Sequence, residues 1–401
     1  MSSTGCAKRR VLVTGMGIVS PLGVGAEENL NSLRQAKDAV SEVTSFDVSR
    51  TRCKTAGQIP DDWFDGVVKF SRKTKRLHRS SHMMIAALRE ALATAEMARP
   101  ELLVVATSSG GMSNGERFYR QLLASTPRRS FPELVANYMP QKPVLDALQA
   151  TQIRAPVQII SNACSAGSNA IGHAFELIKA GMHECVLGGG YDPLGELVFV
   201  GFDALQAATP EKIRPFDRNR SGLVLGEGAA ILVLESEDSA ARRGISALAE
   251  VIGYGVSTDT YHMTQPNPSG IGPRLAMERA MRSAKTEAAS ISYINAHGTA
   301  TIFNDATEGR AISALFRHVP VSSTKSMMGH ALGAAGAIEA GFCVLALRHQ
   351  FLPPNINFRE PDPDSEFEIV ANRPLSAKVE RALSNSFGFG GTNASLVFQR
   401  V

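Results

Sequence analysis

A cysteine lies between small residues in the segment 159–168, whose sequence is IISNACSAGS. An apolar run ends just before it, and apolar side chains follow at helical spacing at Ile171, Phe175 and Ile178. This order is typical of a nucleophile at a strand-to-helix turn, where the side chain is pushed toward substrate. The amides and dipole of the new helix would favour a thiolate at Cys164, which is the reactive form. Free cysteine is also among the most buried residue types, so the local pattern leaves a structural role open.

Three other segments carry polar residues that a purely structural account would not need. Segment 293–301, YINAHGTAT, places His297 in a loop of small residues after an expected strand. Segment 322–330, SSTKSMMGH, places Lys325 and His330 before an expected helix. Segment 385–393, NSFGFGGTN, contains glycines that permit positive φ and close backbone approach. A lone histidine is usually structural, but two in glycine-flanked loops beside a lysine and a cysteine favour a catalytic site.

A cysteine with two histidines fits acyl transfer followed by carbanion formation. The thiolate takes an acyl group as a thioester. Two neutral imidazoles can then hydrogen-bond a thioester carbonyl, where negative charge develops as a carboxylate is lost. A cysteine protease would need only one histidine with an asparagine or aspartate partner. A zinc site would need a ligand pair at short spacing, and the separation of His297 and His330 is not short.

The overall composition narrows the classes of protein. The chain has 401 residues, of which 44% are hydrophobic, and a net charge of +4 that does not decide a partner by itself. This length suits one large α/β unit or two domains. We find no apolar run long enough to span a membrane and no secretory signal at the start. The five cysteines are dispersed without metal-ligand spacing, so we expect reduced thiols, a cytoplasmic location and no metal site.

Short apolar runs bounded by glycine, serine or proline alternate with alanine-rich helical patterns. This alternation predicts an α/β fold with a buried sheet and helices packed on it. The expected strands are 11–14, 102–106, 157–160, 185–187 and 229–234, and the clearest helices are 82–95 and 168–180.

A weak internal repeat is also present, because segments 156–181 and 320–349 both read as strand, small-residue turn and helix. Two copies of one unit suggest a duplicated fold, with halves 1–240 and 241–401 and a boundary near residues 237–244. Chance similarity between two alanine-rich helices is the alternative.

The motifs from VTGMGIVSPLG at 13–23 to SNSFGFGGTNAS at 384–395 resemble the β-ketoacyl-acyl-carrier-protein synthases of the synthase II type, in the thiolase superfamily. This resemblance covers essentially the whole chain, and AHGTAT and VSSTKSMMGHALGAAGAIEA are its most specific parts. It implies a duplicated, thiolase-like α/β/α/β/α five-layer fold and a decarboxylating condensation of acyl and malonyl thioesters. It also implies an acyl carrier protein as partner, a homodimer or a heterodimer with a chain-length-factor homologue, and no cofactor.

The resemblance assigns roles to residues that match the family motifs. Cys164 is the nucleophile, and its backbone N–H with that of Phe389 would form the oxyanion hole. Phe389 would also gate the acyl pocket. His297 and His330 would support decarboxylation and stabilise the enolate. The remaining assignments are Lys325, which organises His330; Glu339, in the supporting network; and Thr299 and Thr301, which bind the pantetheine arm.

A carrier-protein surface is the second expectation from the resemblance. Acyl carrier proteins are acidic, and complementary charge raises encounter rate and fixes register. Two basic groups suit this role, the first around Lys69, Arg72 and Lys73 (with Lys75, Arg76 and Arg79) and the second at Arg128 and Arg129. A solvated helix face is the alternative, while nucleic-acid binding is disfavoured because only Phe70 interleaves the basic residues.

Three departures from the housekeeping pattern bear on specificity. Tyr191 stands where we place the usual glutamate after Gly188 and Gly189, and Ser109 replaces a bulky aliphatic residue expected in the substrate pocket. The pair at 304–305 and the sequence FDA at 202–204 are more similar to α subunits of type II polyketide ketosynthases. We assign Phe199 and Phe202, in the same segment, to the substrate pocket.

Other members of the superfamily fit less well. A chain-length factor would lack the active cysteine, and a thiolase would carry a second cysteine near the C-terminus, where this chain has glycines. Initiating synthases have asparagine at the position of His330. The catalytic α subunit of a ketosynthase/chain-length-factor pair stays open as the alternative to a self-sufficient synthase.

Overall fold

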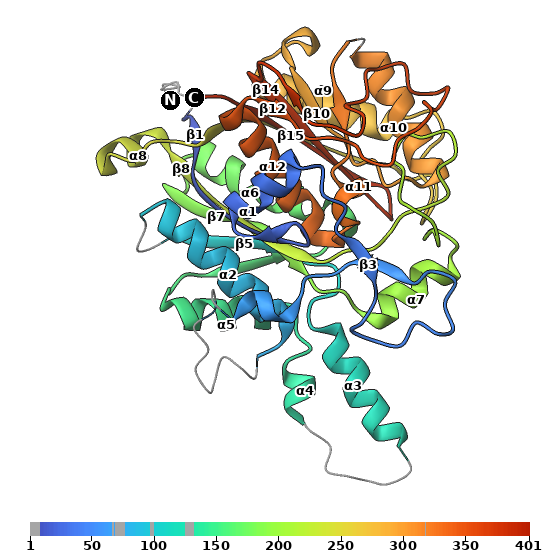
Figure 1. Ribbon diagram of the computed structural model, residues 1–401. Helices are drawn as coiled ribbons and strands as arrows, with labels where there is room; N and C mark the ends of the chain where they lie inside the picture. Colours follow the sequence, from blue (N-terminus) through green and yellow to red (C-terminus); the bar gives the residue numbers. More distant parts are fainter. Residues whose placement is uncertain (1–8, 66–67, 69–76, 97–99, 125–131, 317) are drawn as a thin grey trace.

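The computed structural model describes residues 9–65, 68, 77–96, 100–124, 132–316 and 318–401. Its main element is a mixed sheet that is covered by helices on both faces (Figure 1). The strands expected from the sequence are all present, and several extend further toward the site. The expected helices 82–95 and 168–180 are also present, as α2 (Arg79–Thr94) and α6 (Ala166–Lys179).

Ten of the eleven described strands of the sheet form two sets of five with the same topology, and β2 (Gly23–Val24) pairs with β1 only. The strand orders are β6-β5-β7-β8-β1 and β11-β10-β14-β15-β9. When the five strands of each set are numbered by their position in the chain, the two sets have the same order. Parallel and antiparallel pairings also match position by position. This identity confirms the predicted duplication. The first set is β1 (Val11–Ser20), β5 (Leu102–Ala106), β6 (Val157–Ile160), β7 (Cys185–Asp192) and β8 (Gly228–Ser236); the second is β9 (Ala249–Thr258), β10 (Tyr293–Asn295), β11 (Val321–Ser322), β14 (Arg381–Gly388) and β15 (Thr392–Gln399).

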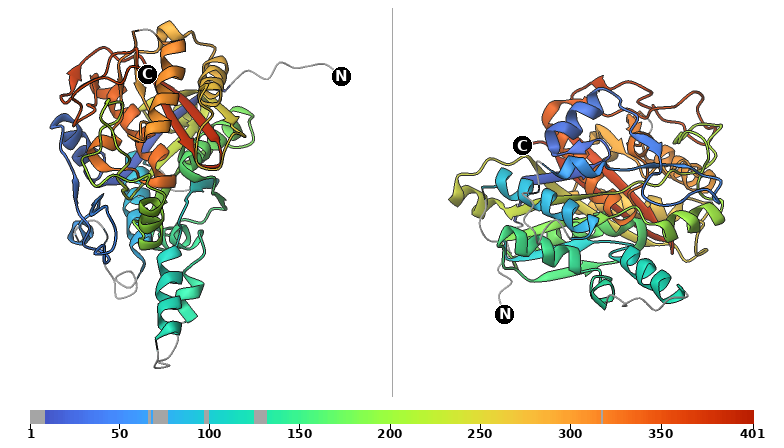
Figure 2. Two further views of the ribbon diagram at one scale, coloured as in Figure 1. Left: turned by 90° about the vertical axis from the view of Figure 1, so that its right-hand side faces the viewer. Right: turned by 60° about the horizontal axis from the view of Figure 1, so that its bottom comes forward.

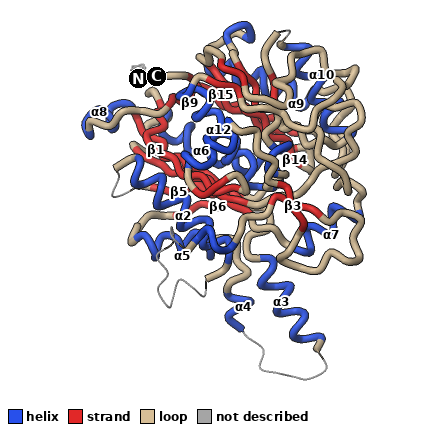
Figure 3. Tube along the Cα trace, in the orientation of Figure 1, coloured by secondary structure: helices blue, strands red, loops and turns tan. Residues whose placement is uncertain are grey.

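The helices form three layers around these strands. Helices α6 and α12 (Ala335–His349) lie between the two sets of strands and contact both, as Figure 3 shows. Helices α2 and α5 (Lys142–Thr151) cover the outer face of the first set. Helix α9 (Ile271–Ala284), with α10 (Ile302–Leu315) beside it, covers the outer face of the second. The five-layer arrangement implied by the family resemblance is therefore confirmed.

Small residues let the two central helices approach closely. A Cβ on Gly167 of α6 would lie 2.7 Å from the backbone nitrogen of Ala337 on α12, so only glycine fits there. Segment Leu332–His349 is apolar and long enough to cross a bilayer by length and composition, but 89% of it is buried inside the protein. It is the core helix of the middle layer, which explains its apolar composition without a membrane.

The remaining elements lie around this body. Helices α3 (Met112–Leu123) and α4 (Pro132–Ala136) project from it together (Figures 1 and 2). The others are β2 (Gly23–Val24), α1 (Ala26–Arg34), β3 (Val40–Glu42), β4 (Thr55–Gly57), η1 (Asp61–Phe64), η3 (Ala163–Ser165), α7 (Glu196–Ala204), α8 (Glu237–Arg243), η4 (Ala288–Ser290), α11 (Lys325–Met328), η5 (Leu332–Ala334), β12 (Phe351–Leu352) and β13 (Leu375–Ser376).

Candidate active site

Cys164 lies at the predicted strand-to-helix turn. Strand β6 ends at Ile160, the 3₁₀ turn η3 carries Cys164, and α6 follows without a break. Ala163 just before it has φ +57°, a strained value for a residue with a side chain. Such strain is kept only where the surrounding structure enforces it, and it often marks functional turns. The turn thus holds Cys164 in one defined position.

Burial and the neighbouring groups act in opposite directions on the protonation state of Cys164. Burial raises the pKa of the thiol to about 11, although Lys325 and the backbone N–H groups of Phe389 and Cys164 act to lower it. Burial therefore opposes the thiolate that the helix amides and dipole would favour, because the cost of desolvating the charge is the larger contribution. Those two N–H groups interact with the sulfur, which is the arrangement that an oxyanion hole at this position requires.

His297 and His330 face each other beside Cys164. Their ring centroids are 5.3 Å apart and the rings are nearly perpendicular. Burial, and then the charge of Lys325, lower the pKa of both rings well below the usual value, so both are neutral at neutral pH. His297 Nδ1 and both nitrogens of His330 have no hydrogen-bond partner among the described residues. The described part of the fold therefore uses none of these three nitrogens for a hydrogen bond.

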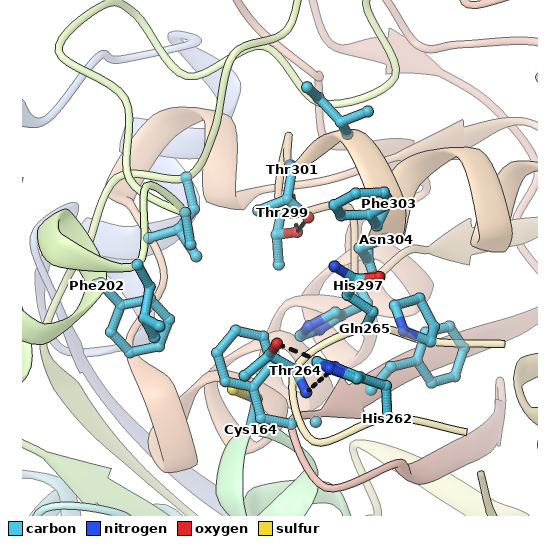
Figure 4. Close-up of a pocket in the computed structure, with 18 of the residues that line it drawn as sticks. Cys164, Phe202, His262, Thr264, Gln265, His297, Thr299, Thr301, Phe303 and Asn304 are labelled. Atoms are coloured by element: carbon cyan, nitrogen blue, oxygen red, sulfur yellow. Dashed lines mark hydrogen bonds between the residues drawn. The ribbon is translucent and has the colours of Figure 1, made fainter. Parts of the chain in front are cut away.

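A cavity of about 200 Å³ brings the reactive groups together. Cys164, His297, His330 and Phe389 line it, and Figure 4 shows Cys164 and His297 with the threonine pair on its wall. The segment that contains His262 and Gln265 closes another side. Sequence analysis did not single out this segment.

Lys325 and Glu339 form an ion pair behind the cavity. Lys325 Nζ lies 2.5 Å from Glu339 Oε1, and both side chains are fully buried. Neither residue lines the cavity, so they act on the imidazoles through charge and packing. The positive charge of Lys325 helps to keep both imidazoles neutral.

Glu308 is a buried carboxylate of the site that the sequence analysis missed. It lies on α10 and accepts the backbone N–H groups of His297 (2.9 Å) and Gly298 (2.8 Å). The side-chain amide of Asn385 also donates to it, at 3.2 Å. Burial raises the pKa of Glu308 to about 7. These hydrogen bonds hold the backbone of the loop that carries His297. No local sequence motif indicates this role.

Phe389 lies in the glycine-rich turn between β14 and β15. Its ring stacks on Phe202 of α7, with centroids 5.5 Å apart, and both residues line the cavity. Gly391 N–H donates to Gly388 O within the turn, while Gly390 N–H donates to Met263 O and Asp259 N–H to Gly391 O. The turn is therefore joined to the segment that carries His262.

The two threonines expected at the pantetheine arm lie side by side. Their hydroxyl oxygens, Thr299 Oγ1 and Thr301 Oγ1, are 2.9 Å apart, and both residues line the cavity. Asn304 lines it as well and donates to Asp305, which accepts the backbone N–H groups of Ala300 and Phe216. Asp305 thus holds the loop that presents the threonines.

Two predicted substrate residues lie elsewhere. Ser109 does not line the cavity, and its hydroxyl and N–H both donate to buried Asp192. Phe199 packs in a core cluster with Phe46 and also does not line the cavity. The structure does not bring these two residues to the reactive groups, and their part in substrate choice stays a prediction.

Most of the predicted carrier-protein residues lie outside the described residues. These are Lys69, Arg72, Lys73, Arg128 and Arg129. Arg79, which the sequence placed with them, is described and does not fit the patch. Its guanidinium pairs with fully buried Glu227 and with exposed Asp61, so two carboxylates of the chain already engage its charge. No group of three or more potential metal ligands gathers within the described part of the chain.

Comparison with known proteins agrees with this geometry. The family model "Beta-ketoacyl synthase, N-terminal domain" matches residues 8–240, and the corresponding C-terminal model matches residues 248–359. A "3-oxoacyl-[acyl-carrier-protein] synthase 2" from Synechocystis is 37% identical, over 98% of each chain.

Two solved structures have the same fold. The ishigamide ketosynthase/chain length factor superposes with a TM-score of 0.93 at 34% identity, covering 98% of this chain and 100% of that one. A type II polyketide synthase acyl-carrier protein in complex with its ketosynthase bound to the hexaketide gives a TM-score of 0.88 at 29% identity, with the same coverage. The motifs, the paired five-strand sets and both family models lead to one conclusion: the chain belongs to the β-ketoacyl synthase family.

Proposed function

We propose that this chain is a β-ketoacyl-acyl-carrier-protein synthase. It joins an acyl group held on Cys164 to a malonyl group delivered by a carrier protein, with loss of carbon dioxide. The observation that carries this function is the convergence of Cys164, His297 and His330 on one cavity, with the N–H groups of Cys164 and Phe389 at the sulfur. The relatives named 3-oxoacyl-acyl-carrier-protein synthase support the same reaction.

In the first half-reaction, Cys164 Sγ attacks the carbonyl carbon of an acyl thioester. A new S–C bond forms at Cys164, the bond to the carrier's sulfur breaks, and the thiol proton of Cys164 ends on the leaving sulfur. Burial keeps the resting thiol protonated, so this proton needs a relay. The neutral imidazoles on the cavity wall supply the base.

In the second half-reaction, the malonyl thioester loses its carboxylate as carbon dioxide. The electron pair of the broken C–C bond passes to the enolate oxygen, which His297 and His330 stabilise through N–H donation. The enolate carbon then attacks the acyl carbonyl, whose oxyanion is held by the N–H groups of Cys164 and Phe389. Collapse returns the electron pair to Cys164 Sγ and releases the β-ketoacyl product, and the resulting thiolate takes up one proton from water to restore the resting thiol.

The partners follow from the same reaction. An acyl carrier protein would present both thioesters, and the solved complex of a related ketosynthase with its carrier protein supports this. Lys69, Arg72, Lys73, Arg128 and Arg129 are the proposed contacts. A cytoplasmic location suits the thiol chemistry, since no disulfide links the cysteines in the described residues.

A second candidate is the catalytic subunit of a ketosynthase/chain-length-factor heterodimer. The superposition on the ishigamide ketosynthase/chain length factor favours it. Either candidate pairs this chain with a second thiolase-like subunit. Strand β6 ends the strand order, and no other strand of the described residues pairs with its outer edge, where such a subunit could add a strand.

Mass spectrometry on the purified chain, supplied with acyl- and malonyl-carrier protein, tests the proposal. We expect acylation of Cys164 followed by a β-ketoacyl product. Cys164→Ala should abolish acylation, whereas His297→Ala should leave acylation detectable and block condensation, because the enolate loses a donor. Condensation at the normal rate by His297→Ala would contradict the assigned role. Acylation of the unaltered chain without elongation would favour the heterodimer.

A further inference from the structure

Asp192, the last residue of β7, is a fully buried carboxylate that the reaction described above does not use. Its Oδ1 accepts the hydroxyl of Thr107 at 2.7 Å, and the hydroxyl and N–H of Ser109 at 2.7 and 2.8 Å. Its Oδ2 accepts the N–H groups of Ser108 at 2.9 Å and Gly333 at 2.7 Å. One side chain thus ties together three segments that are far apart in sequence.

One of these segments carries His330. Gly333 lies in the turn η5, three residues beyond His330, and is the only one of the four described donor residues on the C-terminal side of the fold. The others follow β5. Asp192 therefore joins the turn after His330 to the strands of the first set.

This connection matters because the His330 ring has no hydrogen bond of its own among the described residues. Its place is set by the backbone on either side. Before the turn, His330 N–H donates to Val224 O at 2.7 Å, and Gly226 N–H donates to His330 O at 2.8 Å. After it, Leu332 has φ +51°, a strained conformation that persists only when its surroundings hold it. The hydrogen bond from Gly333 N–H to Asp192 stabilises the backbone on the C-terminal side of His330.

The packing around Gly333 leaves no room for a side chain at this position. A Cβ on Gly333 would lie 2.8 Å from Asp192 Oδ2 and 2.8 Å from Ser108 N. A Cβ on Gly167, near the start of α6, would lie 2.8 Å from Gly333 O. Helix α6 begins directly after Cys164. Asp192 thus fixes the His330 turn against the helix that presents the nucleophile.

We propose that Asp192 is a positioning residue for condensation, which holds the turn η5 so that the His330 ring keeps its place relative to Cys164 Sγ. The inference rests on the proposed function. Asp192 touches no substrate in this role. It matters most in decarboxylation and attack by the enolate, because this half-reaction needs both imidazoles as donors, whereas either imidazole can serve as the base in acylation.

The test is Asp192→Asn in the full-length chain. All five described groups that contact the carboxylate donate hydrogen bonds to it, and the side-chain NH₂ of asparagine is a donor that cannot accept them. We expect kcat for condensation to fall roughly 10- to 100-fold, as for a small displacement of a catalytic group. The KM for the malonyl thioester should change little, and acylation of Cys164 should stay detectable. The two half-reactions are followed separately, by release of carbon dioxide and by the mass of the acylated chain.

Glu235→Gln is the matched control. Glu235 is also a buried carboxylate and accepts the hydroxyls of Thr14 (3.0 Å) and Ser239 (2.7 Å). It pairs with Cys185 at the other end of β7, so it shares the strand pair with Asp192 without approaching the cavity. We expect this variant to lose stability and to keep both half-reactions at their original ratio.

A second variant protects the test against misfolding of the first. In Gly333→Ala the new methyl group clashes with Asp192 Oδ2 and disturbs the same contact. This variant should also slow decarboxylation more than acylation. Folded variants that condense at the unaltered rate, or that lose both half-reactions equally, would overturn the role of Asp192. Failure of the unaltered chain to perform either half-reaction would instead overturn the proposed function.

Discussion

Cys164 shows how burial and reactivity are balanced at a single residue. With a pKa of about 11, the thiol is almost fully protonated at neutral pH, so alkylation by iodoacetamide should be slow. A raised pKa means that the thiolate fraction grows about tenfold per pH unit throughout the range below 11. We predict that the alkylation rate of Cys164, measured by peptide mass spectrometry, rises without a plateau between pH 6 and 9.

The control for this measurement is Cys164→Ser, in which modification of the same peptide should disappear. Cys53 provides an internal reference, because burial raises its pKa to about 12. A plateau in the Cys164 rate below pH 9 would mean that its neighbours stabilise the thiolate more than burial opposes it.

At the residue level, the sequence predicted the site residues that lie in distinctive motifs. It did not predict the carboxylates that hold backbone N–H groups of the site. Cys164, His297 and His330 stand in distinctive segments, and the structure brings them to one cavity. Glu308 and Asp192 were missed because their contacts are mainly to backbone amides and hydroxyls, which no sequence motif relates to these carboxylates. Ser109 shows the converse: its position suggested the substrate pocket, but its hydroxyl is bound to Asp192.

The turn between β14 and β15 is the element whose shape the reaction needs most, since it places the N–H of Phe389. Gly391 has φ +78°, and a Cβ there would lie 1.7 Å from Asp259 O. We predict that Gly391→Ala lowers kcat by roughly 100-fold, because the turn must shift away from Asp259 and carry the oxyanion donor with it. Steady-state condensation kinetics measure this effect.

Gly390→Ala is the matched control for that turn. Gly390 has φ +80°, so alanine meets the same backbone strain of about 1–2 kcal/mol, but no described atom lies within 4 Å of its Cβ position. Thermal unfolding should show that both variants fold and that Gly391→Ala loses more stability, because only this variant also clashes with Asp259. Equal losses of activity would mean that strain alone, and not displacement of the turn, disables the site.

At the level of elements, the periodicity of apolar residues predicted strands and helices well, because buried strands and central helices have strong patterns. The left-handed residues beside the site were not predictable. Ala163 and Leu332 adopt positive φ without being glycine, and the contacts that impose this come from other parts of the fold. The 3₁₀ turns η3 and η5 that carry these residues were hidden for the same reason.

For the whole molecule, the sequence repeat pointed to a duplication that the two matching strand orders make plain. The division at residue 240 stays a prediction, because β1 and β9 pair and join the two sets into one continuous sheet. The repeat of strand, turn and helix also explains why the nucleophile and His330 meet. Cys164 lies between β6 and α6, and His330 lies between β11 and α12. Helices α6 and α12 pack together, which brings the two residues close.

The assembly of two such molecules is the remaining property that the fold predicts. Strand β6 ends the strand order, and Val157, Ile159 and Ile160 are all only partly buried although they are apolar. Pairing of this edge with a second subunit would satisfy its backbone and cover these side chains.

We predict that light scattering on the purified chain gives a molecular mass of twice 42.8 kDa. For Ile159→Lys we predict a mass of 42.8 kDa, because a charge at the edge opposes pairing. Leu375→Lys, on the separate two-stranded sheet of β12 and β13, should leave the dimer intact. A monomer for the unaltered chain would mean that it needs a different, homologous subunit to cover the edge.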